Sequence, residues 1–128
     1  MPAVDLRTQE TKTTEYGRWQ QLNGPLGLDA FGLNAIVCEP GEEFDIAHDE
    51  NESGHQEAYV VVSGRAAFTV GDERVEAGPG TVVSAPNPSQ VRSYEALEPE
   101  TRIVCVGAAP GTPHPYGVWI DEANPVGH

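Results

Sequence analysis

Residues 57–64 read Glu-Ala-Tyr-Val-Val-Val-Ser-Gly, and this stretch decides the fold. Aromatic and β-branched residues fill its centre, which is typical of a β-strand. Because side chains alternate along a strand, the odd-numbered residues from Glu57 to Val61 share one face and the even-numbered residues share the other. Both faces are largely apolar, so we expect a central strand that ends at Gly64.

Short strands and tight turns are expected on both sides of this segment. The other predicted strands are Phe31–Cys38, Glu43–His48, Arg65–Val70, Arg74–Glu76, Thr81–Ala85, Val91–Tyr94 and Thr101–Gly107. They recur about every ten residues and are separated by glycine and proline, which indicates an antiparallel sandwich or barrel. No segment longer than a turn or two has a helical period. The sequence therefore predicts a single all-β domain.

The chain divides into three parts by composition. Residues 1–30 are predicted to form an N-terminal arm with an edge strand, residues 31–108 the barrel, and residues 109–128 a C-terminal tail. The tail is rich in proline and glycine, but residues 116–120 read Tyr-Gly-Val-Trp-Ile. This stretch is too apolar to remain in water, so we expect it to pack on the barrel or on a second chain.

The charge balance is strongly acidic, with 20 Asp and Glu against 7 Lys and Arg and a net charge of −13. Such a field repels nucleic acids and anionic membranes, so neither is expected as a partner. No apolar run reaches the roughly 20 residues of a membrane helix, and the N-terminus lacks the pattern of a signal peptide. We therefore expect a cytoplasmic protein. In that compartment Cys38 and Cys105 would be packed thiols, with a disulfide between neighbouring strands as the alternative.

The two halves of the predicted barrel core resemble the two motifs of the cupin superfamily. In the first, Gly41 precedes His48-Asp49-Glu50, and Glu57 then stands before Gly64 with six residues between them. In the second, Gly80 is followed by five residues, Pro86-Asn87-Pro88, two more residues and Val91. Fifteen residues separate Gly64 from Gly80, which matches the family's short connection.

This resemblance covers about Phe31 to Ala108 and implies a double-stranded β-helix, which is the cupin-type jelly-roll barrel. It also implies a homodimer formed through sheet edges. Within the superfamily, the chain looks like a group of small stand-alone bacterial cupins without an assigned function.

The resemblance implies an incomplete metal site. Metal-binding cupins use two histidines and a glutamate of the first motif and a histidine of the second. His48 and Glu57 match this pattern, Glu50 replaces the second histidine, and Val91 stands where the last one is expected and cannot donate to a metal. The ligand set is thus His48, Glu50 and Glu57, and His55 can substitute because it shares the face of Glu57. One divalent ion (Fe, Mn, Zn or Ni, with Mg²⁺ also plausible) and no metal at all are equally expected.

A second interpretation treats the barrel mouth as a pocket for a small organic molecule. The predicted pocket residues are His48, Glu50, His55, Glu57, Tyr59, Val91 and Arg92. Arg92 could clamp a carboxylate in bidentate fashion. Strand alternation places it opposite to Val91, however, so it reaches the pocket only if the bend at Pro86-Asn87-Pro88 shifts the register.

Three functions follow from these features. The first is a cupin that binds a small organic ligand beside a degenerate metal site. The second is a metal-dependent enzyme of isomerase, oxygenase or lyase type, with His48 as ligand or base and Glu57 as ligand or acid–base partner. The third is a structural or interaction protein without catalysis. No nucleophile motif is present, and no catalytic residue can be assigned from the sequence alone.

Overall fold

The computed structural model describes residues 2–111. The tail beyond Gly111, including the apolar stretch 116–120, lies outside the described residues. The described chain forms the strands β1 (Lys12–Thr14), β2 (Gly17–Gln21), β3 (Gly32–Cys38), β4 (Gln56–Ser63), β5 (Ala66–Val70), β6 (Glu73–Ala77), β7 (Val82–Ala85), β8 (Arg92–Ala96) and β9 (Thr101–Ala108), and the short helix α1 (Asn23–Leu26). None of its helices is long and apolar enough to cross a membrane.

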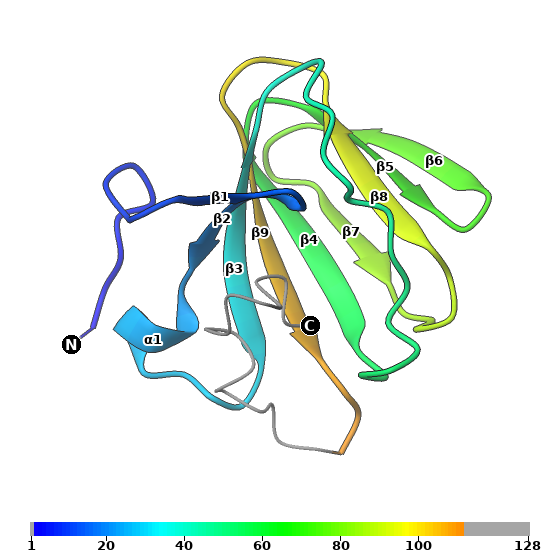
Figure 1. Ribbon diagram of the computed structural model, residues 1–128, viewed down its shortest axis with the longest axis horizontal. Coiled ribbons are helices and arrows are strands. Elements are labelled where there is room, and N and C mark those ends of the chain that lie inside the picture. Colours follow the sequence, from blue (N-terminus) through cyan, green and yellow to red (C-terminus); the bar gives the residue numbers. More distant parts are fainter. Residues whose placement is uncertain (1, 112–128) are drawn as a thin grey trace.

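The strands form two antiparallel sheets (Figure 1). The larger has the order β1-β2-β3-β9-β4-β7, and the smaller has the order β6-β5-β8. From β4 onward the chain passes between the two sheets, which gives a jelly-roll arrangement with a core between the layers. The predicted all-β fold is confirmed, although the two sheets are not closed into one continuous barrel.

The core lies between the facing surfaces of the two sheets. Its buried residues are Trp19, Ile36, Cys38, Tyr59, Val61, Ala66, Phe68, Ala77, Ala85, Tyr94, Ala96, Ile103 and Cys105. The ring of Phe68 lies between those of Tyr59 and Tyr94 in tilted contacts, with ring centroids 5.4 Å and 6.5 Å apart. These contacts join β4 to β5 and β8, so the strand that carries Glu57 is held by both layers.

Strand β4 is internal to the larger sheet, between β9 and β7, as its apolar sequence predicts. Glu57, Tyr59 and Val61 are buried and face the core. On the other side of the strand, Val62 is 43% exposed. The alternation read from residues 57–63 is therefore confirmed, but the outer face is only partly covered by the described chain.

Gly64 is required where β4 ends and the chain turns toward β5. Its φ is +71°, a conformation that favours glycine. A Cβ atom there would lie 2.6 Å from the Cα of Thr101 and 2.2 Å from its Oγ1. Because a backbone atom cannot yield, this close approach fixes the start of β9 beside the end of β4.

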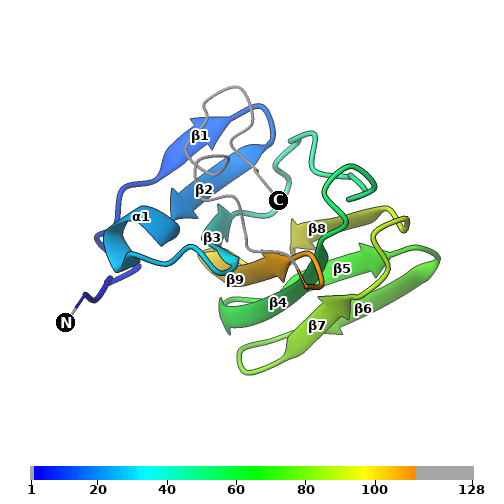
Figure 2. The same cartoon turned by 90° about the horizontal axis from the view of Figure 1, so that it is seen from below.

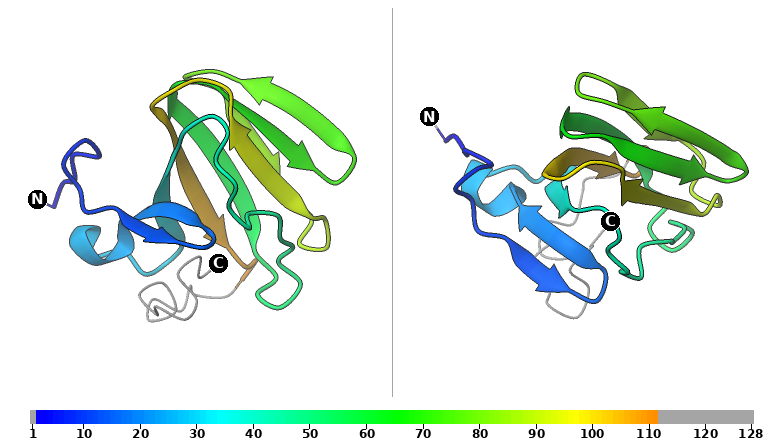
Figure 3. Two further views of the ribbon diagram at one scale, coloured as in Figure 1. Left: turned by 45° about the horizontal axis from the view of Figure 1, so that its top comes forward. Right: turned by 90° about the horizontal axis from the view of Figure 1, so that it is seen from above.

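The N-terminal residues form the far edge of the larger sheet. Strand β1 pairs with β2 and β2 with β3, and the pair β1–β2 lies on the opposite side of the molecule from β5 and β6 (Figures 2 and 3). The buried side chain of Gln20 donates to the backbone carbonyls of Leu6 and Gln9 at 2.7 and 3.0 Å. These bonds tie the arm to the outer face of the sheet.

One local expectation was wrong and one was settled. The stretch Glu43–His48 is not a strand, and its pairing reduces to a single bridge between His48 and Arg92. The predicted strand Thr81–Ala85 is present as β7, at the edge of the larger sheet, and its Val82 is 60% exposed. Cys38 and Cys105 are both buried free thiols, so the packed-thiol interpretation is confirmed and the disulfide is excluded.

Candidate functional site

A buried carboxylate, that of Glu57, forms the centre of the candidate site. Its side chain is 0% exposed. The Tyr59 hydroxyl donates to Glu57 Oε1 at 2.9 Å, Arg92 Nη1 donates to the same oxygen at 3.1 Å, and the Cys105 thiol donates to Oε2 at 3.3 Å. Strands β4 and β9 of the larger sheet and β8 of the smaller one therefore supply the donors that make burial of this charge tolerable.

Arg92 provides the buried positive charge next to Glu57. Its side chain is 1% exposed, and its guanidinium also donates to the carbonyls of Gln90 (3.2 Å) and Asn87 (2.7 Å). The loop after Pro86 thus wraps around the guanidinium. A buried ion pair of this kind is tolerated only when its remaining donors are satisfied, and three of the five N–H donors of Arg92 have these protein partners.

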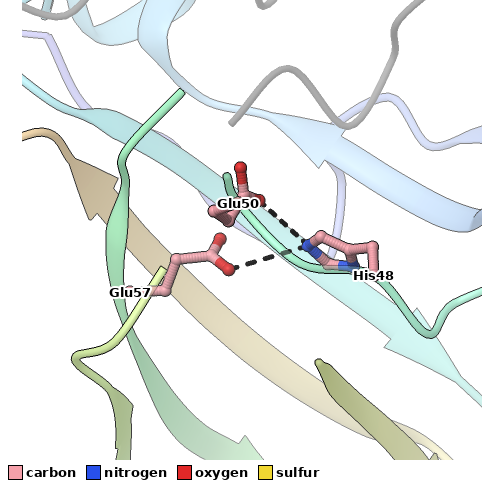
Figure 4. Close-up of side chains that lie close together, drawn as sticks. All are labelled: His48, Glu50 and Glu57. Carbon is pink, nitrogen blue, oxygen red and sulfur yellow. Dashed lines mark hydrogen bonds and ion pairs between the residues drawn. The ribbon is translucent and has the colours of Figure 1, made fainter. Parts of the chain in front are cut away.

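His48 and Glu50 bring two further charges to the same point. In Figure 4 the side chains of His48, Glu50 and Glu57 point toward one another. His48 Nε2 lies 3.0 Å from Glu50 Oε1 and 3.7 Å from Glu57 Oε1. Paired backbone bonds between His48 and Arg92, at 2.8 and 3.0 Å, fix the histidine beside the start of β8.

The hydrogen bonds of His48 determine its protonation. Burial lowers the pKa of the imidazole, but its bonds with Glu50 and Glu57 outweigh that effect and raise the pKa from 6.5 to about 10. Nδ1 lies 2.8 Å from the carbonyl of Ile46, so both ring nitrogens face oxygens. Without a metal the ring is therefore an imidazolium at neutral pH, and it donates to both sides.

These groups balance in formal charge. Two carboxylates, Glu50 and Glu57, face two cations, Arg92 and the imidazolium of His48. The side chains of Glu50, Glu57 and Arg92 are 4% exposed or less, whereas that of His48 is 28% exposed. The histidine is therefore the member of this group that a solute reaches first.

Two further groups complete the surroundings of Glu57 without adding charge. Burial raises the pKa of Tyr59 well above its usual value, and the nearby Glu57 carboxylate adds to the shift. Burial likewise raises the pKa of the Cys105 thiol, again with help from Glu57. Both side chains therefore keep their protons and act as hydrogen-bond donors.

The other predicted pocket residues differ in where they lie. Val91 was expected to line the far side of the pocket, but it is 51% exposed and outside the cluster, while Arg92 takes the inward position. Strand β8 begins at Arg92, and Val91 precedes it. His55 is buried at 3% but does not belong to the group of close ligand atoms formed by the other three residues.

Sequence reasoning missed two members of the site. Cys105 was interpreted as a packed thiol, yet it pairs with Tyr59 across β9 and β4 and donates to Glu57. The alternation along Thr101–Gly107 places it on the core face, which is a signal that could have found it. The Ser53 hydroxyl donates to Glu50 Oε2 at 2.6 Å from an irregular loop, and no sequence pattern predicts that contact.

The arrangement of three of these residues fits a divalent metal ion. Three possible ligand atoms, one each from His48, Glu50 and Glu57, all lie within 4.8 Å of one another. The contact of Nδ1 with the Ile46 carbonyl also orients Nε2 toward the carboxylates, as a hydrogen bond at the other ring nitrogen does for histidines that bind a metal. Against this, Arg92 and Tyr59 already donate to the Glu57 oxygen that faces His48. A metal would therefore compete with a fixed cation.

Comparisons with known proteins identify the fold. No family model and no curated protein matches the sequence. Among solved structures, a sugar phosphate isomerase of the cupin superfamily from Silicibacter pomeroyi aligns with a TM-score of 0.68 at 19% identity, over 88% of this chain and 78% of that one. A cupin 2 conserved barrel domain protein from Salinispora arenicola aligns with a TM-score of 0.66 at 19% identity, over 86% and 90% of the two chains.

A third structure, a predicted oxalate decarboxylase from Thermotoga maritima, aligns with a TM-score of 0.68 at 14% identity, over 84% of this chain and 98% of that chain. At such low sequence identities the alignments show a shared fold but do not assign an activity. The two glycine-bounded motifs, the two-sheet topology and these alignments agree. The fold of this chain is that of the cupin superfamily.

Proposed function

We propose that the protein binds a small oxygen-rich organic molecule next to the cluster formed by His48, Glu50, Glu57 and Arg92. The observation that carries this proposal is a buried, charge-balanced group of four side chains that meets solvent through His48. Buried ion pairs contribute little net stability compared with apolar packing, so their presence inside a small core favours a functional role.

The hydrogen bonds support different roles for the residues around Glu57. Arg92, Tyr59 and Cys105 hold Glu57 in place. Both N–H groups of His48 already bond to the protein, so its partly exposed ring would attract an oxygen of the ligand through its positive charge and not through a further N–H bond. Carboxylate, carbonyl and hydroxyl oxygens all meet this requirement. The chemical class of the ligand is therefore a sugar, a sugar acid or a small hydroxy acid or keto acid.

A thermal-shift screen of chelator-treated protein tests this proposal. A panel of neutral sugars and of small carboxylates, each at about 100 times its dissociation constant, should raise the midpoint by about 5 °C or more for the bound class. The His48→Gln variant should lose the shift, whereas Arg74→Gln, which removes an exposed charge, should keep it. Shifts of equal size in the wild type and in His48→Gln, or no shift with any compound, would contradict it.

The convergence of three ligand atoms favours a second candidate, a metal-dependent enzyme of isomerase, oxygenase or lyase type. His48, Glu50 and Glu57 would hold the ion, which would polarise an oxygen of the substrate when bound. Elemental analysis of protein purified without chelators distinguishes the two candidates. Near-stoichiometric metal that disappears in Glu57→Gln supports the enzyme, and its absence from folded wild-type protein supports the binding protein.

A further inference from the structure

The outer face of the larger sheet carries an apolar surface that the described chain leaves partly open. Strand pairing aligns Val82 of β7 with Val60 of β4, Val60 with Val104 of β9, and Val104 with Ala35 of β3. The adjacent row places Ala58 beside Val106 and Ser84, and Val106 beside Leu33. We call the part contributed by β9, β4 and β7 the valine face; it consists of Ala58, Val60, Val62, Val82, Val104 and Val106.

Exposure on this face increases toward β7. Ala35, at the β3 end, is 0% exposed, and the arm bound to Gln20 covers the neighbouring position. At the other end, Val62 is 43% and Val82 60% exposed. Large apolar side chains grouped at this exposure are typical of a surface that another segment covers.

The chain itself supplies a matching segment beyond Gly111. Residues 116–120, Tyr-Gly-Val-Trp-Ile, contain no charge, and residues 112–115 contain none of the acids that fill the rest of the sequence. This segment is apolar enough to require burial. We propose that residues 116–120 dock on the valine face of their own chain.

The starting point of the segment makes this contact reachable. Strand β9 ends at Ala108, which pairs with Gln56 at the beginning of β4. From there, Val62 lies six residues along β4, or about 20 Å. Val118 lies ten residues beyond Ala108, a contour of about 33 Å when extended. The tail therefore reaches the whole valine face, even with the turns that Pro110, Pro113 and Pro115 favour.

Docking on the valine face would place the tail on the side of β4 opposite to the candidate site, because the Glu57 side chain faces the core. Gly107 pairs with Glu57, so the chain leaves the sheet one residue beyond the level of the central carboxylate. The proposal does not depend on a ligand or on a metal, and its failure would leave the proposed function untouched.

Quenching of Trp119 fluorescence by acrylamide in the full-length chain tests the contact. Trp19→Phe leaves Trp119 as the single tryptophan; if that variant does not fold, the difference between the wild type and Trp119→Phe gives the same signal. We expect the quenching constant of Trp119 to be at least threefold below that of a free peptide of residues 112–128. Val82→Asp should raise it at least twofold. Val75→Asp, a matched control at a 44% exposed valine of β6, should leave it unchanged.

Two results would overturn the proposal. One is a Trp119 that is quenched as readily as the free peptide in every variant. The other is protection that Val82→Asp and Val75→Asp leave equally intact, since the segment would then lie elsewhere. Light scattering during the same titrations identifies the third outcome: protection that appears only with a doubling of mass means that a second copy of the chain is the occupant, which contradicts docking within one chain.

Discussion

The two faces of β4 differ in the kind of side chain that they bury and expose. Its inner face places the ionised side chain of Glu57 in the core next to Tyr59 and Val61, while its outer face exposes Val62 at 43%. In the usual pattern for a sheet with one solvated side, the charge would lie outside and the valine inside. The inversion indicates that each face requires a partner: the inner one a counter-charge, and the outer one a cover.

The two requirements differ in strength. A buried carboxylate without a partner costs several kcal/mol, so Arg92 and the donors from β4 and β9 are obligatory for the fold. An exposed valine costs much less free energy, so the fold remains stable even when nothing covers the outer face. Substitutions on the inner face should therefore have larger effects than substitutions on the outer face.

The largest effect is expected from removing the counter-charge of Glu57. Arg92→Met should lower the free energy of unfolding by about 3–5 kcal/mol, because it leaves a fully buried carboxylate uncompensated. Glu57→Gln should be nearly as harmful, and the double variant should be less destabilised than the sum of the two, since each change removes the charge that the other would leave unpaired. Urea denaturation measures all three.

Arg74→Met serves as the control for this cycle. Arg74 pairs with Glu76 on the surface with half of its side chain exposed, so its loss should change stability by less than about 0.5 kcal/mol. A cost below about 1 kcal/mol for Arg92→Met would show that the inner face does not depend on the ion pair.

The next effect concerns His48, which joins the cluster from the loop before β4. Its pKa in the folded chain is about 10, against 6.5 for an ordinary histidine. The stabilisation from the imidazolium is therefore complete below about pH 6.5 and is lost as the pH rises through about 10. In chelator-treated protein at pH 6, His48→Gln should cost about 1.5–3 kcal/mol, the range for hydrogen bonds to charged groups.

The difference between wild type and His48→Gln isolates this effect from other groups that titrate at high pH, such as the Cys38 thiol, whose pKa burial raises to about 12. Denaturation curves for both proteins at intervals from pH 6 to pH 10.5 supply the difference. It should shrink toward the alkaline end. A constant difference across this range would mean that the imidazole is uncharged in the folded state.

The sequence predicts the fold well because the fold depends on local patterns. Alternation in residues 57–63, glycines at the turns and short apolar runs are each readable within a window of about ten residues. Gly64 shows why: its place at the end of β4 follows from a positive φ, which favours glycine, and from a close approach to Thr101 that leaves no room for a Cβ atom. The stretch Glu43–His48 alternates in the same way but meets a neighbouring strand only at His48, which bridges Arg92 of β8, so the strand predicted from its pattern was wrong.

The site is less predictable because its members meet through tertiary pairing. His48, Glu50 and Glu57 were identified from a resemblance to spaced motifs, and the structure brings them together. Arg92 was predicted to reach the pocket only if the bend that begins at Pro86 shifts the strand register. Val91 was assigned the inward position that Arg92 occupies. A change of one residue reverses every side chain of a strand, and no local pattern fixes where β8 begins after an irregular loop.

The smallest effect compares two adjacent valines of β4. Val61 is 0% exposed in the core, so Val61→Ala leaves a cavity and should cost about 2 kcal/mol. Val62→Ala changes a side chain on the outer face and should cost less than about 0.5 kcal/mol in a chain that ends at Gly111, where the tail cannot cover it. In the full-length chain the cost of Val62→Ala should rise, because a docked tail buries the methyl groups that alanine lacks. Urea denaturation of Val62→Ala and of the unsubstituted protein, each in both chain lengths, measures this increase in cost. An identical cost of Val62→Ala in both chain lengths would mean that the tail does not cover β4.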